Sequence, residues 1–140
     1  MNMNDLTEIK EFVRTASLYL EGDFSNYPKI HNFLKSHDGG IHLKINNFKL
    51  RNHVKLTIER KNVITVLKKF ISDETTLEDV NLWGEFVRHE LFINFNAEDL
   101  VLSEVIDRLE SIGDSIDGEF TKKDAEFYLM QLQKSPVGQN

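Results

Sequence analysis

Five histidines and 23 acidic residues are the side chains of this chain best able to hold a metal or move a proton, and cysteine is absent. No two histidines have the i, i+4 spacing with which a helix presents two imidazoles to zinc, and no carboxylate accompanies them at ligand spacing. Without cysteine there are no disulfides, thiolate nucleophiles or cysteine-ligated zinc. We therefore expect no metal site and no cofactor. The histidines are His31, His37, His42, His53 and His89.

Other short patterns that carry chemistry are incomplete. Residues 114–119 have the oxygen-rich composition of a calcium loop, but the glycine is at the fifth position instead of the sixth, and Ala125 occupies the twelfth. Gly39-Gly40 is too short for a phosphate-binding loop, and no Gly-x-Ser-x-Gly sequence marks a nucleophile. Paired carboxylates are too abundant to single out an acid and a base. We predict that the chain has no catalytic residues and is not an enzyme.

Charge is strongly segregated along the chain. Residues 28–72 carry 10 basic and 2 acidic side chains, whereas residues 73–119 carry 2 basic and 14 acidic ones. The two segments therefore have formal charges of +8 and −12 within a chain whose total is −6. This acidic surplus exceeds what solubility requires of a small domain.

The acidic surplus is concentrated on a predicted helix over residues 97–112 and the loop that follows it. Asn96 is the predicted N-cap, and Asp99 is placed in the first turn, where a carboxylate faces the positive end of the helix dipole. Asp107 and Glu110 lie opposite the apolar stripe. A solvated face and a docking surface for a basic protein are both open interpretations. The candidate partner-binding residues are Asp99, Glu104, Asp107, Glu110, Asp114, Asp117 and Glu119.

The basic block of residues 44–69 supports an alternative function. Its spacing along a predicted hairpin and helix is compatible with a stripe that contacts phosphates, as in a nucleic-acid-associated regulator. The sequence pI of about 5.3 makes this the weaker hypothesis, because nucleic-acid-binding domains are usually basic as a whole. The block consists of Lys44, Lys49, Arg51, Lys55, Arg60, Lys61, Lys68 and Lys69.

The elements that must position these residues are mostly helices. Gly84, inside one of them, is expected to allow close approach of a neighbouring helix. Residues 91–95 are expected to be extended. Thr121 and Asp124 are placed to cap the last helix. Apolar residues at three- and four-residue steps predict helices over about residues 6–20, 26–37, 57–71, 77–87, 97–112 and 121–132.

Alternating apolar and polar residues predict a short β-hairpin around residues 41–56. The fold class is therefore mainly α, with about six helices in one bundle-like domain over residues 1–135, or α+β if the hairpin forms. Residues 136–140 are predicted to be a frayed tail.

The segment Met1–Asp5 has no basic stretch followed by an apolar run, so we expect no signal peptide. No segment approaches 18 apolar residues, so we expect no membrane partner. Together with the absence of cysteine, these features favour a cytoplasmic protein. The oligomeric state is left open.

The order of segments in the second half of the chain is similar to that of a known family. Val63–Ile71 is followed by a short polar break, by Leu82-Trp83 within the next helix, by Glu104–Leu109, and by Gly118–Thr121 before the last helix. This order resembles small bacterial immunity proteins, the antitoxins of contact-dependent inhibition and related polymorphic toxin systems. The resemblance covers about residues 57–133.

The resemblance implies a protein that neutralises a cognate toxin domain by binding to it. Many toxins of these systems are basic nucleases, and an acidic inhibitor can occupy a surface built for phosphates. That implication agrees with the acidic surplus, and no binding residue is carried over from the family. An immunity protein is therefore the leading hypothesis, and its expected partner is a basic cognate toxin.

Overall fold

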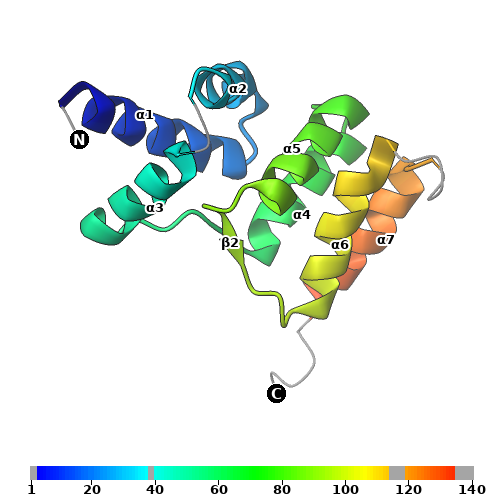
Figure 1. The fold of residues 1–140 in the computed structure, drawn as a ribbon. Coiled ribbons are helices and arrows are strands. Elements are labelled where there is room, and N and C mark those ends of the chain that lie inside the picture. The colour runs from blue at the N-terminus through cyan, green and yellow to red at the C-terminus, as the bar shows by residue number, and fades with distance from the viewer. Residues whose placement is uncertain (1–2, 38–39, 114–118, 135–140) are drawn as a thin grey trace.

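The computed structural model describes residues 3–37, 40–113 and 119–134. This part of the chain contains seven α-helices, so the expected mainly α class is confirmed (Figure 1). The predicted tail at 136–140 lies outside the described residues. The helices are α1 (Met3–Leu20), α2 (Tyr27–Lys35), α3 (Ile41–Asn52), α4 (Arg60–Ile71), α5 (Leu77–His89), α6 (Leu100–Glu110) and α7 (Lys122–Gln133). Two short 3-10 helices, Phe24–Asn26 and Ser111–Gly113, and two strands, β1 (Thr57–Ile58) and β2 (Asn94–Phe95), complete the elements.

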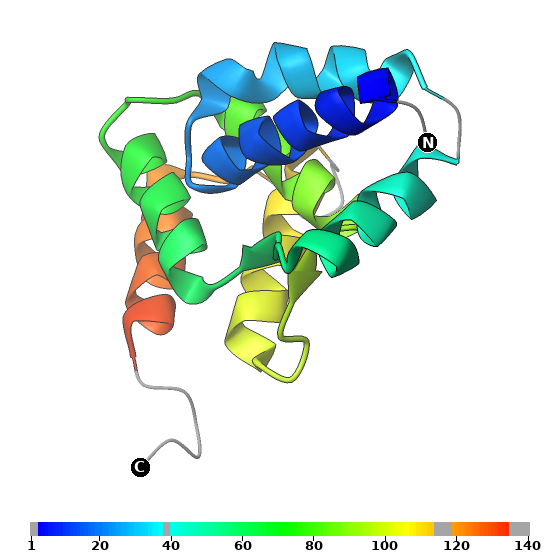
Figure 2. The same cartoon turned by 90° about the vertical axis from the view of Figure 1, so that its left-hand side faces the viewer.

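The helices form two groups. In Figure 1, α1, α2 and α3 lie together on one side of β2, and α4 to α7 lie together on the other. The helix α5 packs along α6, and α4 packs along α7. Figure 2 shows α1, α2 and α3 from their outer side. None of the helices in the described residues combines the length and apolar character that a bilayer crossing requires.

The predicted hairpin around residues 41–56 is wrong, because residues 41–52 form the helix α3. Its buried apolar residues are Ile41, Ile45 and Phe48, which recur at helical steps, while Leu43 remains 67% exposed. A strand would place Leu43 on the same face as Ile41 and Ile45. The helix ends at His53, which takes a left-handed conformation with φ of 53°.

The strands form a small parallel sheet in which Thr57 pairs with Asn94 and Ile58 with Phe95. Parallel strands need a long crossover, and α4 and α5 supply it here. The predicted extended segment at 91–95 contains β2, but β1 occupies residues that the sequence assigns to the start of a helix.

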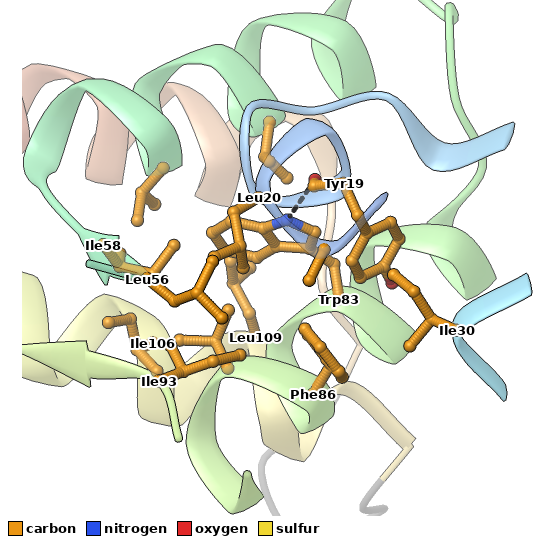
Figure 3. Packing of buried hydrophobic residues seen from close by; sticks show 14 of the residues in the cluster. Tyr19, Leu20, Ile30, Leu56, Ile58, Trp83, Phe86, Ile93, Ile106 and Leu109 are labelled. Atoms are coloured by element: carbon orange, nitrogen blue, oxygen red, sulfur yellow. Dashed lines mark hydrogen bonds between the residues drawn. The ribbon is translucent and has the colours of Figure 1, made fainter. Parts of the chain in front are cut away.

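A single cluster of buried apolar side chains runs through both helix groups. Trp83 of α5 lies fully buried in it, and its indole N–H donates to the carbonyl oxygen of Tyr19 in α1 at 3.1 Å (Figure 3). The Tyr19 ring meets the ring of Phe86 edge to face, with centroids 5.3 Å apart. These contacts fix α5, and therefore its neighbour α6, relative to α1.

Candidate partner-binding surface

The helix α6 is shorter than the sequence predicts. It begins at Leu100 instead of Ala97, and the N-cap is Asp99 instead of Asn96. The Asp99 carboxylate accepts a hydrogen bond from the N–H of Leu102 at 3.2 Å, which satisfies one of the free donors of the first turn. The apolar stripe predicted for this helix consists of Leu102, Val105, Ile106, Leu109 and Ile112. The first four are buried, as expected, whereas Ile112 is half-buried and lies beyond the end of α6.

Asp99 does not belong to an exposed acidic surface, so this part of the prediction is wrong. Its two carboxylate oxygens accept from Nε and Nη2 of Arg60, both at 2.7 Å, and the two side chains are only 13% and 14% exposed. The Arg60 hydrogen bonds hold the pKa of the Asp99 carboxyl below its usual value. Arg60 also donates to the carbonyl oxygens of Leu132 and Lys134, at 3.2 and 2.8 Å. Asp99 and Arg60 therefore join α4, α6 and the end of α7.

Three other predicted residues do lie on α6. Glu104 is exposed, with no ion-pair partner in the described part of the chain. Asp107 accepts from Arg88 of α5 at 2.7 Å, in a pair whose side chains are about half exposed. Glu110 pairs with His89, also of α5, and is largely covered. The neighbouring helix therefore offsets part of the predicted charge.

Leu100 is a surface residue that the sequence analysis missed. It is 77% exposed in the first turn of α6, although it is a large apolar residue. Glu104 and Asp107 follow it at steps of four and three residues, so the three side chains share one face. We call Leu100, Glu104 and Asp107 the α6 stripe. The signal in the sequence was an apolar residue that falls outside the buried periodicity of its helix.

The remaining predicted acidic residues follow α6. Asp114 and Asp117 lie outside the described residues. Glu119 is exposed and precedes the buried Phe120, whose ring lies 5.2 Å from the guanidinium of Arg108. That contact places Glu119 near the C-terminal half of α6. The structure thus keeps Glu104 and Asp107 on an open face, with Glu119 beyond the end of the helix.

The basic block does not form the stripe that the predicted hairpin implied. Lys49 is buried, and its ammonium donates to the carbonyl oxygen of Phe92. Arg60 is held by Asp99, and Lys69 donates to the carbonyl oxygen of Gly22 at 2.8 Å. Lys44, Arg51, Lys55, Lys61 and Lys68 are exposed, and Lys61 pairs with Glu59 at 3.7 Å. Lys49, Arg60 and Lys69 therefore hold segments of the fold together, and Lys61 has an acidic neighbour.

Three histidines each form a pair with a single carboxylate from a distant part of the chain. His37 lies 3.4 Å from Glu8, His42 lies 2.7 Å from Glu90, and His89 contacts Glu110. Across the described residues, no group of three or more histidine, aspartate or glutamate side chains could hold a metal ion. The surface around α6 combines an exposed apolar residue with negative charge, a combination that occurs at protein interfaces.

Comparison of the chain with protein-family models, with curated proteins and with solved structures finds no match.

Proposed function

We propose that this chain is an immunity protein that binds a basic toxin domain in the cytoplasm and neutralises it. The observation that carries the proposal is the α6 stripe, in which an exposed leucine is followed on the same face by exposed carboxylates one and two turns later. An apolar anchor beside charged groups is typical of a protein interface, where the anchor contributes affinity and the charge accelerates encounter.

The surroundings of the stripe favour a basic partner. Residues 77–113 carry nine carboxylates and two arginines, and Arg88 already pairs with Asp107. A phosphate backbone would be repelled by this surface, whereas a protein that binds nucleic acid would be attracted to it. This preference supports a toxin of the nuclease class.

Charge reversal at Glu104 tests the stripe. The partner to use is the small domain encoded at the end of the gene next to this one, purified with its active site inactivated. For Glu104→Lys we expect an association rate about tenfold slower at low ionic strength, with the difference shrinking as salt screens the charges. Stopped-flow fluorescence at several salt concentrations measures this rate.

The matched control is Glu11→Lys, an exposed carboxylate on α1. It changes the net charge by the same amount, so we expect its association rate to stay within about twofold of wild type. Equal slowing by both variants would show that only total charge matters and that the stripe is not the interface. If the neighbouring domain forms no complex and its toxicity is not relieved on co-expression, the immunity function is wrong.

The nucleic-acid alternative makes the opposite prediction. In a gel shift with generic duplex DNA and RNA at low salt, we expect no retarded band, because three cations of the basic block are engaged inside the fold. If the wild-type protein retards the nucleic acid and Arg51→Glu does not, the result would favour the nucleic-acid-associated regulator.

A further inference from the structure

A second surface feature lies away from α6, at the C-terminal end of α3. A pocket of about 480 Å³ opens between this end of α3, the segment before β1, and β2. Leu50 and Val54 supply its apolar wall, and Leu50 is 76% exposed. In Figure 1, α3 and α6 lie on opposite sides of β2. The volume is in the range of small-molecule sites.

All ionisable side chains that line the pocket are basic. They are Lys49, His53 and Lys55, and no carboxylate accompanies them. Except for Asn94, the lining residues belong to the basic segment of residues 28–72. The negative end of the α3 dipole is equivalent to about half a charge, whereas the two lysines contribute two full charges. The pocket therefore favours an anion.

Lys49 is the group in the pocket that an anion would stabilise most. Its side chain is buried, with 8% of the residue exposed, and the acceptor of its ammonium is the neutral carbonyl oxygen of Phe92. Burial lowers its pKa, and no carboxylate acts against that effect. An ammonium has three donors, so a ligand oxygen at the pocket wall would supply both an acceptor and a countercharge.

Two amide side chains complete the polar lining. Asn46 and Asn94 both face the pocket, and neither side-chain amide has a hydrogen-bond partner within the described ranges of the chain. An amide can donate to a carboxylate oxygen beside the lysine. The polar groups and the apolar wall are thus adjacent, which matches a ligand that carries its charge at one end.

We infer that this pocket binds a small amphipathic monocarboxylate. The carboxylate contacts the Lys49 ammonium and the amides of Asn46 and Asn94, and the apolar body lies on Leu50 and Val54. This inference does not rest on the proposed immunity function, because it concerns a different surface and a different class of ligand.

Octanoate and octanamide, which share the same apolar chain and differ in the head group alone, test the inference on wild-type protein. We expect octanoate to bind about tenfold more tightly in calorimetry, because its hydrogen bonds to the lysine are charge-assisted. In two-dimensional amide NMR spectra, the shifts should centre on Asn46, Leu50, Val54 and Asn94. Equal affinity of the two probes, or shifts spread over the molecule, would overturn the inference.

The variant Lys49→Met keeps an unbranched side chain only one atom shorter and removes its charge. We expect it to reduce the preference for octanoate to under twofold, whereas Lys68→Met, an exposed lysine of α4, leaves it unchanged. An unchanged preference in Lys49→Met would show that Lys49 only ties α3 to Phe92. If Lys49→Met does not fold, Leu50→Asp provides the second variant, and it should abolish octanoate binding. Glu104→Lys should bind octanoate as wild type does.

Discussion

Replacing Asp99 with alanine is expected to lower the free energy of unfolding by about 3–5 kcal/mol, the usual cost of leaving one member of a buried ion pair without its partner. Arg60 loses both of its 2.7 Å hydrogen bonds to the carboxylate while it remains largely covered. The first turn of α6 also loses its N-cap. Urea unfolding followed by circular dichroism and by Trp83 fluorescence measures the change.

Two further variants separate the causes of that loss. Asp99→Asn keeps a good N-cap and removes only the charge, so it should be about 1 kcal/mol more stable than Asp99→Ala. The double variant Arg60→Met/Asp99→Asn removes both charges and should lose less stability than Asp99→Ala alone. A double variant as unstable as the sum of its two single changes would show that the ion pair does not couple the helices.

The pH dependence of stability tests the same contact between Asp99 and Arg60, and the direction of the effect can be stated. Because Arg60 lowers the pKa of Asp99 below its usual value of 3.8, the folded protein holds this carboxyl ionised more strongly than the unfolded chain does. The contribution to stability is complete above that value and is lost as pH falls through the lowered pKa. Wild type should therefore lose its advantage over Asp99→Asn as the pH falls below about 4. An advantage that stays constant over this range would contradict the assignment.

Gly84→Ala is expected to lower the free energy of unfolding by about 2–4 kcal/mol, through overpacking and lost hydrogen bonds. A Cβ at this position would lie 2.7 Å from the carbonyl carbon of Leu109 and 2.8 Å from the nitrogen of Glu110. Both are backbone atoms of α6, so the helix itself must move. The movement would stretch the two 2.9 Å hydrogen bonds from Asn81 to the carbonyl oxygens of Leu109 and Glu110. The gain of about 1 kcal/mol in helix propensity does not offset these losses.

Gly113→Ala is the matched control for this change. A Cβ there meets only the side-chain oxygen of Asn81, at an ordinary 3.7 Å, so we expect a change below about 0.5 kcal/mol. Thermal unfolding of the two variants under the same conditions makes the comparison. Similar losses in both would mean that the approach of α5 to α6 tolerates a methyl group.

Local periodicity determined much of the helical structure in advance. The buried stripe from Leu102 to Leu109, the close approach at Gly84 and the capping of the last helix by Thr121 and Asp124 were predicted and are confirmed. These features depend on residues within one or two turns of each other, or on the absence of a side chain, and the sequence displays both directly.

The hairpin prediction failed because alternation over five residues does not distinguish a strand from a helix that leaves one leucine exposed. The spacing of Ile41 and Ile45 satisfies both patterns, and the packing of Phe48 and the Lys49 side chain decides for the helix. The pairing of β1 with β2 was equally hidden, because each strand is two residues long and its partner lies beyond two helices.

The distribution of charge was likewise predictable from the sequence only in part. The sequence by itself determined that residues 73–119 are strongly acidic. The exposed acidic face that Glu104 and Asp107 form on α6 follows from this. Only the tertiary structure decided that Asp99 is turned inward to Arg60, 39 residues earlier, and that Arg88 covers part of Asp107. Charge along a chain is counted in one dimension, whereas ion pairs form between residues that folding brings together from distant segments.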